Sequence, residues 1–533
     1  MEIRKYKILI SDSIAKEGID YLKSFPNFEV DVKTKHTKQE LIEMVPSYHA
    51  IIIRSATKLD ADVIAAAENL RVIARAGTGY DNIDIEACNK KGIVVMITPT
   101  GNSNAVIELT FGLMLDHARN IGKANNLLSQ GKWEKKALEG YELKGKTIGI
   151  IGFGRIGAGV AKRAKAFEMN VLTHDKYVPK AYAEEMGAKL IENVDDLLKQ
   201  ADYITLHIPL TDETKNLINE EKLKLMKPNV VIVNVARGGI VDEKALVKAL
   251  DDNKIGGACF DVFTKEPAIK EDIPLIGHPK VVCTPHLGAS TYEAQIEVAK
   301  LAAEHIAQAL NSDIYIDAVN LPFRLNPSLA EVFKPYMKLA NYMGKILTQY
   351  RKGRIEHVLI EYKGDLISQF DSLRAVLLYS FFSKRFADTV TYMNLEEILA
   401  QNKISVTVEK ITKRVNYETV MKMTVIGTEG KSVIAGTVFS ERPKIIEIDD
   451  QYMDVEPSEY MLILKSIDRP GVIGMVGTFL GQNGINIAGW QLGRKAVGGD
   501  ALSVITLDNL VSPEIIEKLK KLENIKEAYF IQI

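Results

Sequence analysis

The segment TIGIIGFGRIG, residues 147–157, decides the fold of the middle of the chain. An apolar run of strand length leads into Gly152, Gly154 and Gly157, and a helical pattern follows over residues 156–167. In such a strand–loop–helix unit the first glycine makes the tight turn, the second lets the backbone approach a pyrophosphate, and the third allows the helix to pack closely on the strand. The segment therefore predicts a dinucleotide site at the start of a parallel α/β unit.

A carboxylate ends the strand that follows this helix. Asp175 closes the run VLTHD, eighteen residues after Gly157. A carboxylate at this place accepts hydrogen bonds from ribose hydroxyls and repels a 2′-phosphate, which favours NAD over NADP. The neighbouring Lys176 acts against this preference because a cation tolerates a phosphate, and a solvated acid at a strand end is the alternative interpretation of Asp175.

Short β-branched runs alternate with amphipathic stretches from residue 6 to about residue 310. Strands joined through helices lie parallel and are covered on both faces. These runs are too numerous for one small sheet, so we expect two Rossmann-like, doubly wound parallel-sheet domains. The predicted strands lie at residues 7–10, 28–32, 50–53, 72–74, 147–151, 170–173, 203–206, 230–234 and 258–261.

Two long helical stretches connect these domains. The first runs over residues 105–128, after a strand near residue 93 and the turn TPTGNSN. The second, residues 292–310, is long enough to return the chain to the first domain. We therefore expect a discontinuous substrate-binding domain, residues 1–98 and 291–316, around a cofactor domain at residues 99–290.

The pattern changes after residue 317. The runs ISVTVEKIT and VMKMTVIG-TEGK-SVIAGTVF alternate apolar and polar residues around a glycine-containing turn, which predicts a solvated antiparallel hairpin within an α+β domain at residues 317–455. Residues 459–533 are typical of a βαββαβ, ferredoxin-like module. Its predicted strands are 460–464, 485–492, 502–507 and 527–532, and its predicted helices are 472–482 and 513–522. The expected class is α/β overall.

Composition excludes several classes of protein. The 533 residues are more than three times the usual domain size of roughly 100–150 residues, so several cores are expected. The 68 Lys and Arg residues balance 69 Asp and Glu residues, which leaves no field to attract nucleic acid or an anionic membrane surface. Cys88, Cys259 and Cys283 are too few and too scattered for a disulfide framework or a CxxC metal site, which indicates a reducing, cytoplasmic setting and no metal. No run approaches the ~18–20 uncharged residues of a membrane span and no signal-peptide core is visible, so we expect a soluble protein.

Three charged or titratable residues, Arg237, Glu266 and His286, follow strands of the predicted cofactor domain, at the sheet edge where such sheets bind ligands. Taken singly, each has a structural alternative: a surface ion pair, a helix cap and a hydrogen-bonded loop histidine. Beside a nicotinamide site they suit the oxidation of a secondary alcohol. A histidine takes up the hydroxyl proton, a glutamate fixes its tautomer and favours the imidazolium form, and an arginine grips a carboxylate with two parallel hydrogen bonds. The residue types predict a 2-hydroxy acid as substrate.

These motifs resemble those of the D-2-hydroxyacid dehydrogenase family: GFGRIG, HD at 174–175, NVARGGIVDE at 234–243, FDVFTKEP at 260–267 and TPHLGAST at 284–291. Within it, RAGTGYDNID at 75–84 and TGNS at 100–103 are similar to the long-form D-3-phosphoglycerate dehydrogenases, which carry an intervening domain of the allosteric substrate-binding type and an ACT regulatory domain. The resemblance covers nearly the whole chain. It implies oxidation of 3-phospho-D-glycerate to 3-phosphohydroxypyruvate with NAD, the first step of L-serine biosynthesis.

The resemblance also implies roles for residues by their position in the motifs. Arg237 binds the substrate carboxylate, Glu266 orients the base, and His286 is that base. Ile208 departs from the threonine of many relatives, which affects details of the cofactor contacts. The residues implied around NAD are Thr78, Gly152, Gly154, Arg155, Ile156, Gly157, Asp175, Pro209, Val235, Ala236, Asp261, Gly288 and Ala289.

A phosphorylated substrate requires a second cationic cluster on the opposing domain. Arg54 and Arg75 end two predicted strands there, and we expect them to converge on the cleft beside Gly77; two solvated strand-end arginines are the alternative. Lys135, in GKWEKK, corresponds to a basic residue that in relatives reaches the phosphate of a neighbouring subunit, although a charge run beside an aromatic residue also fits a solvated helix end.

The C-terminal module carries its own ligand signal. Asp468, in the turn of KSIDRPGVIG, and Asn486, in GINIAG, lie where ACT domains that pair across a subunit interface bind an amino acid, and in this family the effector is commonly L-serine. Structural capping by both residues is the alternative. A homo-oligomer, with a tetramer as the family expectation, follows from the resemblance.

Two other functions remain open at this point. One is a dehydrogenase or reductase for another 2-hydroxy acid, such as glyoxylate, hydroxypyruvate or 2-oxoglutarate. The other is a dinucleotide-sensing scaffold with a peptide-docking surface. Arg54, Arg75 and the amino-acid-binding character of the C-terminal module argue against both.

Overall fold

The first α/β unit is built on a five-stranded parallel sheet of order β2-β1-β3-β4-β5. The computed structural model describes the chain except residues 1–4, 313, 324–329, 365–369, 387–389, 412–416 and 495. The central strand β3 is apolar and buried along its whole length because helices cover both faces of the sheet. The strands are β1 (Tyr6–Ile10), β2 (Phe28–Val32), β3 (Ala50–Ile53), β4 (Val72–Arg75) and β5 (Val94–Ile97); the helices are α1 (Lys16–Lys23), α2 (Lys38–Met44), η1 (Val45–Ser47), α3 (Ala61–Ala66) and α4 (Ile85–Lys91).

The second α/β unit contains a seven-stranded parallel sheet of order β12-β11-β10-β9-β6-β7-β8. The chain order reverses between β6 and β9, which is the switch point where doubly wound sheets bind ligands. Its strands are β6 (Thr147–Ile151), β7 (Asn170–His174), β8 (Lys189–Leu190), β9 (Tyr203–Leu206), β10 (Val231–Asn234), β11 (Gly257–Phe260) and β12 (Val281–Cys283); its helices are α5 (Ser103–Arg119), α6 (Ile121–Ser129), η2 (Lys135–Leu138), α7 (Arg155–Ala166), α8 (Lys180–Glu185), α9 (Val194–Gln200), α10 (Glu220–Leu225) and α11 (Glu243–Asp251).

The connections between the two units differ from the prediction in one respect. The predicted single helix over residues 105–128 is wrong, because α5 ends and α6 begins at Asn120, whose φ is 53°. Asparagine adopts this left-handed conformation more readily than most residues, so it breaks a helix that the apolar pattern alone would continue. The return helix is as expected: α12 (Tyr292–Ser312) packs against α1 and β4 of the first unit.

The third unit is a six-stranded mixed sheet of order β14-β13-β15-β16-β17-β18. The hairpin β15–β16 is antiparallel as predicted, but β14 pairs parallel to β13 on the other side. The hairpin is not solvated: α13 packs on one face, and Ile411 and Tyr417 cover Ala435 and its neighbours on the other. The elements are α13 (Ala330–Tyr350), β13 (Ile355–Lys363), α14 (Phe370–Phe382), α15 (Leu395–Gln401), β14 (Ser405–Lys410), β15 (Val420–Gly427), β16 (Gly430–Phe439), β17 (Arg442–Ile448) and β18 (Gln451–Val455).

The fourth unit confirms the βαββαβ prediction. Its antiparallel sheet has the order β20-β21-β19-β22, with α16 and α17 on one face and α13 of the third unit packed against β22. The elements are β19 (Tyr460–Ile467), α16 (Val472–Gln482), β20 (Ile487–Arg494), β21 (Asp500–Leu507), α17 (Pro513–Leu519) and β22 (Ile525–Gln532). The α/β class with two parallel-sheet units and two further units is therefore confirmed.

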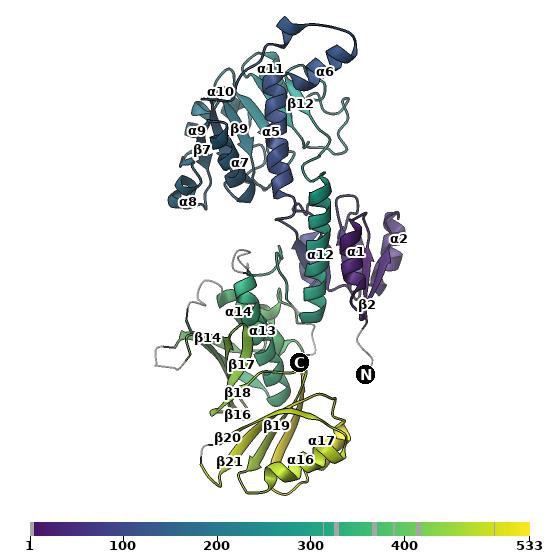
Figure 1. The fold of residues 1–533 in the computed structure, drawn as a ribbon, viewed down its shortest axis with the longest axis vertical. Coiled ribbons are helices and arrows are strands. Elements are labelled where there is room, and N and C mark those ends of the chain that lie inside the picture. The colour runs from purple at the N-terminus through teal and green to yellow at the C-terminus, as the bar shows by residue number, and fades with distance from the viewer. Residues whose placement is uncertain are drawn as a thin grey trace.

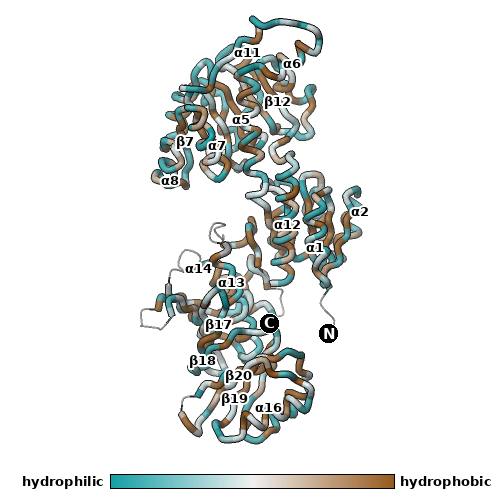
Figure 2. The backbone as a smooth tube through the Cα atoms, in the orientation of Figure 1, coloured by the Kyte–Doolittle hydropathy of each residue, from teal (hydrophilic) through white to brown (hydrophobic). Residues whose placement is uncertain are grey.

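The four units lie in a row along the longest axis, in the order second, first, third and fourth (Figure 1). Helix α12 lies between the second and third units and beside α1. Hydrophilic and hydrophobic residues alternate along α5 and α12, as expected for helices that cover a sheet with one face (Figure 2). Among the described residues, no helix combines the length and apolar character that a membrane span needs.

Candidate active site

The glycine loop after β6 forms a cradle at the N-terminus of α7. Gly152 has a φ of 92°, and a Cβ there would lie 2.4 Å from the carbonyl oxygen of His207. A Cβ on Gly157 would lie 2.1 Å from the carbonyl oxygen of Gly152, whereas one on Gly154 would meet nothing within 4 Å. The open side of Gly154 leaves the first N–H groups of α7 accessible, which suits a pyrophosphate. All three glycines therefore fit the predicted cofactor.

Asp175 holds the glycine loop in place. One carboxylate oxygen accepts a hydrogen bond from the backbone N–H of Phe153 at 2.7 Å and the other from that of Tyr177 at 2.8 Å. The side chain is half-buried, so it is fixed rather than freely solvated. Lys176 points its charge at Glu213, 2.7 Å away, and this pairing reduces the cation's ability to attract a 2′-phosphate.

Asp261 anchors the loop that carries His286. Its buried carboxylate accepts hydrogen bonds from the Thr284 hydroxyl at 2.6 Å and from the N–H groups of Leu287 at 2.7 Å and Gly288 at 2.9 Å. Burial raises the pKa of Asp261 above its usual value, although these hydrogen bonds act in the opposite direction. His286 sits in this loop with a φ of 55°, a conformation that the surrounding contacts hold.

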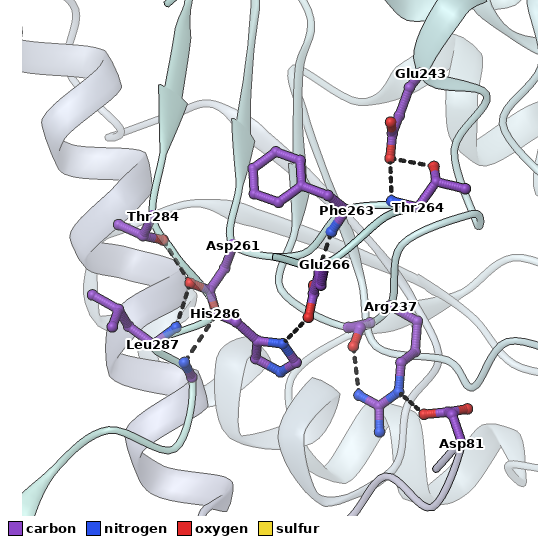
Figure 3. Close-up of polar contacts among 12 residues, drawn as sticks. Asp81, Arg237, Glu243, Asp261, Phe263, Thr264, Glu266, Thr284, His286 and Leu287 are labelled. Carbon is purple, nitrogen blue, oxygen red and sulfur yellow. Dashed lines mark hydrogen bonds and ion pairs between the residues drawn. The ribbon is translucent and has the colours of Figure 1, made fainter. Parts of the chain in front are cut away.

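His286 and Glu266 form a hydrogen-bonded pair (Figure 3). The Nδ1 atom of His286 lies 2.6 Å from one oxygen of Glu266, whose other oxygen accepts from the N–H of Phe263 at 3.1 Å. Burial raises the pKa of Glu266, but the hydrogen bonds from His286 and Phe263 outweigh burial and hold it below its usual value. Glu266 is therefore ionised at neutral pH, which fixes the proton on Nδ1 and leaves Nε2 as the acceptor.

Arg237 lies at the end of β10 beside this pair (Figure 3). Its Nε donates to Asp81 of the first unit at 3.1 Å, and Nη1 donates to the carbonyl of Ala236 at 2.6 Å. The buried Asn234 fixes the turn by donating to the Arg237 carbonyl at 2.8 Å and accepting from the Ala236 N–H at 3.1 Å. Sequence reasoning did not assign roles to Asn234 or Asp81, although both lie inside motifs that it singled out.

Arg75 lies close enough to Arg237 and Arg54 for both of their charges to act on it. Burial, followed by the charges of Arg237 and Arg54, lowers the pKa of Arg75 to about 10. The guanidinium of Arg75 lies against Gly77, where a Cβ would be 1.6 Å from Nη1, and its buried Nε has no hydrogen-bond partner in the described part of the chain. Arg54 donates to the Ser13 carbonyl at 3.1 Å, and burial lowers its pKa as well. The guanidiniums of Arg54 and Arg75 from the first unit and of Arg237 from the second thus lie in one region of the structure.

The other residues expected around the cofactor line the same edge of the second unit or the adjoining loop of the first. The Thr78 hydroxyl donates to Asn102 at 3.0 Å, and Pro209 accepts from the Thr214 hydroxyl at 2.7 Å. Arg155 opens α7, and its charge lowers the pKa of Asp317, although burial raises that pKa overall. The remaining members, Ile156, Val235, Ala236, Gly288 and Ala289, are half-buried or buried.

Lys135 lies apart from the three arginines. It is exposed in η2, within a projecting segment whose Ile121, Leu128, Trp133 and Tyr141 are exposed as well. Figure 1 places the neighbouring α6 at the end of the molecule away from α12. Within one chain the structure does not bring Lys135 to the cluster, so its reach into a neighbouring subunit stays a prediction.

Burial keeps two other histidines and two cysteines in their neutral forms. Burial lowers the pKa of His207 to about 3 and that of His305 to about 4, so both rings stay neutral. Burial raises the pKa of Cys283 to about 11 and that of Cys88 to about 12, which keeps these thiols protonated. Among the described residues no group of three or more His, Cys, Asp or Glu is placed to hold a metal ion.

Asp468 and Asn486 lie at opposite ends of the sheet in the fourth unit. The register pairs Tyr460 with Leu507 and Ile467 with Asp500, which places Asn486 near the first end and Asp468 near the second. Asp468 accepts from Arg494 at 2.7 Å, and this hydrogen bond lowers its pKa; it does not cap α16, whose N-cap is Gly471. A single chain therefore does not bring the two residues together, and a shared effector site requires two copies of this unit.

Comparison with known proteins matches most of the chain. Residues 111–288 match the NAD binding domain of the D-isomer specific 2-hydroxyacid dehydrogenases, residues 332–449 the intervening domain of D-3-phosphoglycerate dehydrogenase, and residues 460–524 the ACT domain. The chain is 42% identical over 528 residues to D-3-phosphoglycerate dehydrogenase of Methanocaldococcus jannaschii, covering 99% of this chain and 100% of that protein. It is 40% identical over 530 residues to the enzyme of the same name from Archaeoglobus fulgidus, covering 99% and 100%.

Solved structures match about three-fifths of the chain. A glyoxylate reductase from Paecilomyes thermophila is 30% identical with a TM-score of 0.55, and the match covers 59% of this chain and 98% of that one. The TT0316 protein of Thermus thermophilus is 34% identical with a TM-score of 0.53, covering 59% and 99%. The match of residues 111–288 to the NAD binding domain supports NAD as the cofactor of the second unit.

The cradle geometry predicts different outcomes for two alanine substitutions. Gly157→Ala places a Cβ 2.1 Å from a carbonyl oxygen, so we expect lower thermal stability and weaker NADH binding, at a cost of roughly 1–3 kcal/mol typical of overpacking. Gly154→Ala enters open space, so we expect unchanged thermal stability and NADH binding weakened about tenfold, because the methyl group occupies the approach of the pyrophosphate. Fluorescence titration with NADH and thermal denaturation measure both. If Gly154→Ala binds NADH with wild-type affinity, the pyrophosphate does not bind beside Gly154.

Proposed function

This chain belongs to the D-3-phosphoglycerate dehydrogenases, which are NAD-dependent oxidoreductases, and from that membership we propose that it oxidises 3-phospho-D-glycerate to 3-phosphohydroxypyruvate, the first step of L-serine biosynthesis. The convergence of Arg54, Arg75 and Arg237 carries this proposal. A carboxylate and a phosphate on one small substrate supply the anionic charge that three guanidiniums require. A non-phosphorylated hydroxy acid would leave part of the cluster without a counter-ion.

The arginines divide between the two anionic ends of the substrate. Arg237 lies beside His286 and Glu266, so it grips the carboxylate next to the reacting carbon. Arg54 and Arg75 lie on the first unit and take the phosphate. Arg75 remains protonated at neutral pH because its lowered pKa is still about 10. A bound dianion relieves the mutual repulsion that lowers this pKa.

His286 serves as the base in this proposal. Its Nε2 takes the proton of the substrate hydroxyl, while Nδ1 stays bonded to ionised Glu266, which stabilises the imidazolium that forms. The glycine cradle and Asp175 would hold NAD, which when bound would supply the acceptor for the hydride that leaves the carbinol carbon. The C–O bond then becomes a carbonyl, and the reaction balances with one proton on His286. Asp261 and Asn234 hold the loops that present His286 and Arg237.

The alternative functions fit this site less well. A reductase for glyoxylate or another small 2-oxo acid needs Arg237 but gives Arg54 and Arg75 no counter-ion. A dinucleotide-sensing scaffold makes no use of the His286–Glu266 pair. Family membership and the two-ended cationic cluster together favour the phosphoglycerate reaction.

Regulation and organisation complete the proposal. We propose that L-serine acts as a feedback effector at paired ACT domains, that the protein is a cytoplasmic homo-oligomer, with a tetramer as the family expectation, and that Lys135 contacts the substrate of a neighbouring subunit. The proposed substrate-binding domain comprises residues 1–98 and 291–316, the NAD-binding domain 99–290, the intervening domain 317–455 and the ACT domain 459–533.

Substrate preference tests the central proposal. NADH formation is expected with 3-phospho-D-glycerate at far higher kcat/KM than with D-glycerate or D-lactate. Arg75→Ala should raise KM for 3-phospho-D-glycerate by about ten- to hundredfold, from the loss of a charge-assisted hydrogen bond of roughly 1.5–3 kcal/mol. The exposed Arg442→Ala in the third unit is the matched control and should change nothing. Equal rates on all three acids would reject the phosphate assignment.

Substitution of Glu266 tests the roles of His286 and Glu266. Burial raises the pKa of Glu266, but the hydrogen bonds from His286 and Phe263 hold it below its usual value, so the residue stays ionised throughout the neutral range and fixes the proton of the His286 ring on Nδ1. Glu266→Gln removes this charge, so we expect kcat to fall about tenfold or more at neutral pH. Glu243→Gln, which removes a carboxylate bonded to Thr264 N–H nearby, should leave kcat unchanged. A wild-type kcat in Glu266→Gln would remove Glu266 from this role.

L-Serine titration tests the proposed effector site. We expect L-serine to inhibit the wild-type enzyme, and Asp468→Ala or Asn486→Ala to require about tenfold more, because each removes one charged or polar contact. Asp500→Ala removes a different carboxylate at the Asp468 end of the sheet and should be inhibited like the wild type. If L-serine inhibits all four proteins at the same concentrations, the effector does not bind at Asp468 and Asn486.

A further inference from the structure

A carboxylate of the first unit contacts the guanidinium of the second. Asp81, in the loop between β4 and α4, lies 3.1 Å from Nε of Arg237, although the two residues are 156 positions apart in the chain. The pair lies next to Glu266 and His286 (Figure 3). Asp81 does not bond to the other members of the site in the described structure, so its contact with Arg237 is the one to be explained.

We propose that Asp81 is a positioning residue for substrate recognition: it holds the guanidinium of Arg237 so that its outer N–H groups face the substrate carboxylate. This inference rests on the proposed role of Arg237. A guanidinium has five N–H groups, and here one on Nε bonds to Asp81 and one on Nη1 bonds to the Ala236 carbonyl. The other three, on Nη1 and Nη2, are left for a carboxylate that binds with two parallel hydrogen bonds.

The glycines before Asp81 make room for this arrangement. A Cβ on Gly79 would lie 1.9 Å from Nη2 of Arg237, and one on Gly77 would lie 1.6 Å from Nη1 of Arg75. Any side chain at either position would therefore push a guanidinium out of place. The loop at residues 77–81 thus accommodates two guanidiniums with its glycines and fixes one of them with its carboxylate.

Charge balance also favours this role. The charges of Arg237 and Arg54 lower the pKa of Arg75, whereas those of Asp81 and Asp12 raise it. Asp12 is occupied by backbone N–H groups of Arg54 and Thr57 and by the Thr57 hydroxyl. Of these two carboxylates, Asp81 is the one that contacts a guanidinium directly, through Nε of Arg237. It therefore offsets part of the repulsion that Arg237 adds to the cluster.

The expected effects of Asp81 on folding stability and on substrate binding differ in size. Asp81 is 68% exposed and Arg237 29% exposed, and an ion pair of this kind contributes only about 0–1 kcal/mol to folding. A small displacement of a substrate-gripping group, in contrast, costs up to about a hundredfold in catalysis. Loss of Asp81 should therefore appear in substrate binding and leave thermal stability almost unchanged.

Steady-state kinetics on the full-length enzyme tests the inference. We expect Asp81→Ala to raise KM for 3-phospho-D-glycerate by about ten- to hundredfold, with KM for NAD and thermal stability unchanged. Asp81→Asn keeps an oxygen that accepts from Nε and should recover part of the loss. Asp84→Ala is the matched control from the same loop: Asp84 caps α4 by accepting from Ala87 N–H at 2.9 Å, so this variant should lose stability and keep KM. Unchanged or lowered KM in Asp81→Ala would overturn the inference.

A double-mutant cycle with Arg237→Ala separates this inference from the proposed function. If Asp81 acts through Arg237, Asp81→Ala should have little further effect on KM in the Arg237→Ala background. Effects that multiply would show that Asp81 acts independently of Arg237 and would overturn the inference while leaving the proposed function intact. An Arg237→Ala enzyme with wild-type KM would instead reject the carboxylate-binding role of Arg237 on which both rest.

Discussion

The repulsion among three guanidiniums, contributed by two separate sheets, is the constraint on which the rest of the site depends. Removing Arg75 from water disfavours its charged form, and the charges of Arg237 and Arg54 disfavour it further. The fold holds the three arginines together because β3, β4 and β10 have their carboxyl ends near the contact between the first and second units. The carboxylates of Asp12 and Asp81 offset part of the cost, and an anionic substrate would offset more.

The two α/β units have different tasks at this contact. The second unit presents the proposed reacting groups on loops that buried polar residues fix, with Asp261 holding the His286 loop and Asn234 the turn before Arg237. The first unit supplies Arg54 and Arg75 at the carboxyl ends of β3 and β4, and Asp81 on the loop that contains Gly77 and Gly79. Helix α12 packs on α1 while its amino end follows the His286 loop, so it joins this loop directly to the first unit.

Local patterns predicted what depends on local chain chemistry. The apolar runs of the parallel strands and the glycine motif before α7 were correct, because buried strands and tight turns constrain composition at each position. The break at Asn120 was missed because one left-handed residue leaves the apolar pattern intact. The parallel pairing of β14 with β13 was missed because alternation indicates which face is buried and not which strand is the neighbour. The motifs nominated Arg237 but not its contact with Asp81, because this contact joins residues that lie far apart in the chain.

The packing of the C-terminal half shows which α/β unit the third and fourth units are joined to. One continuous apolar cluster runs from β1 and α12 of the first unit, through Tyr315 and Phe323 at Tyr392, to α13 and the fourth sheet. A Cβ on Gly92 of the first unit would lie 2.0 Å from Thr391 of the third, so these units are in direct contact. The seven-stranded sheet has its own two clusters. Continuous apolar packing therefore joins the proposed effector domain to the first unit, which carries Arg54, Arg75 and Asp81, whereas the NAD cradle belongs to the second unit with its own apolar clusters.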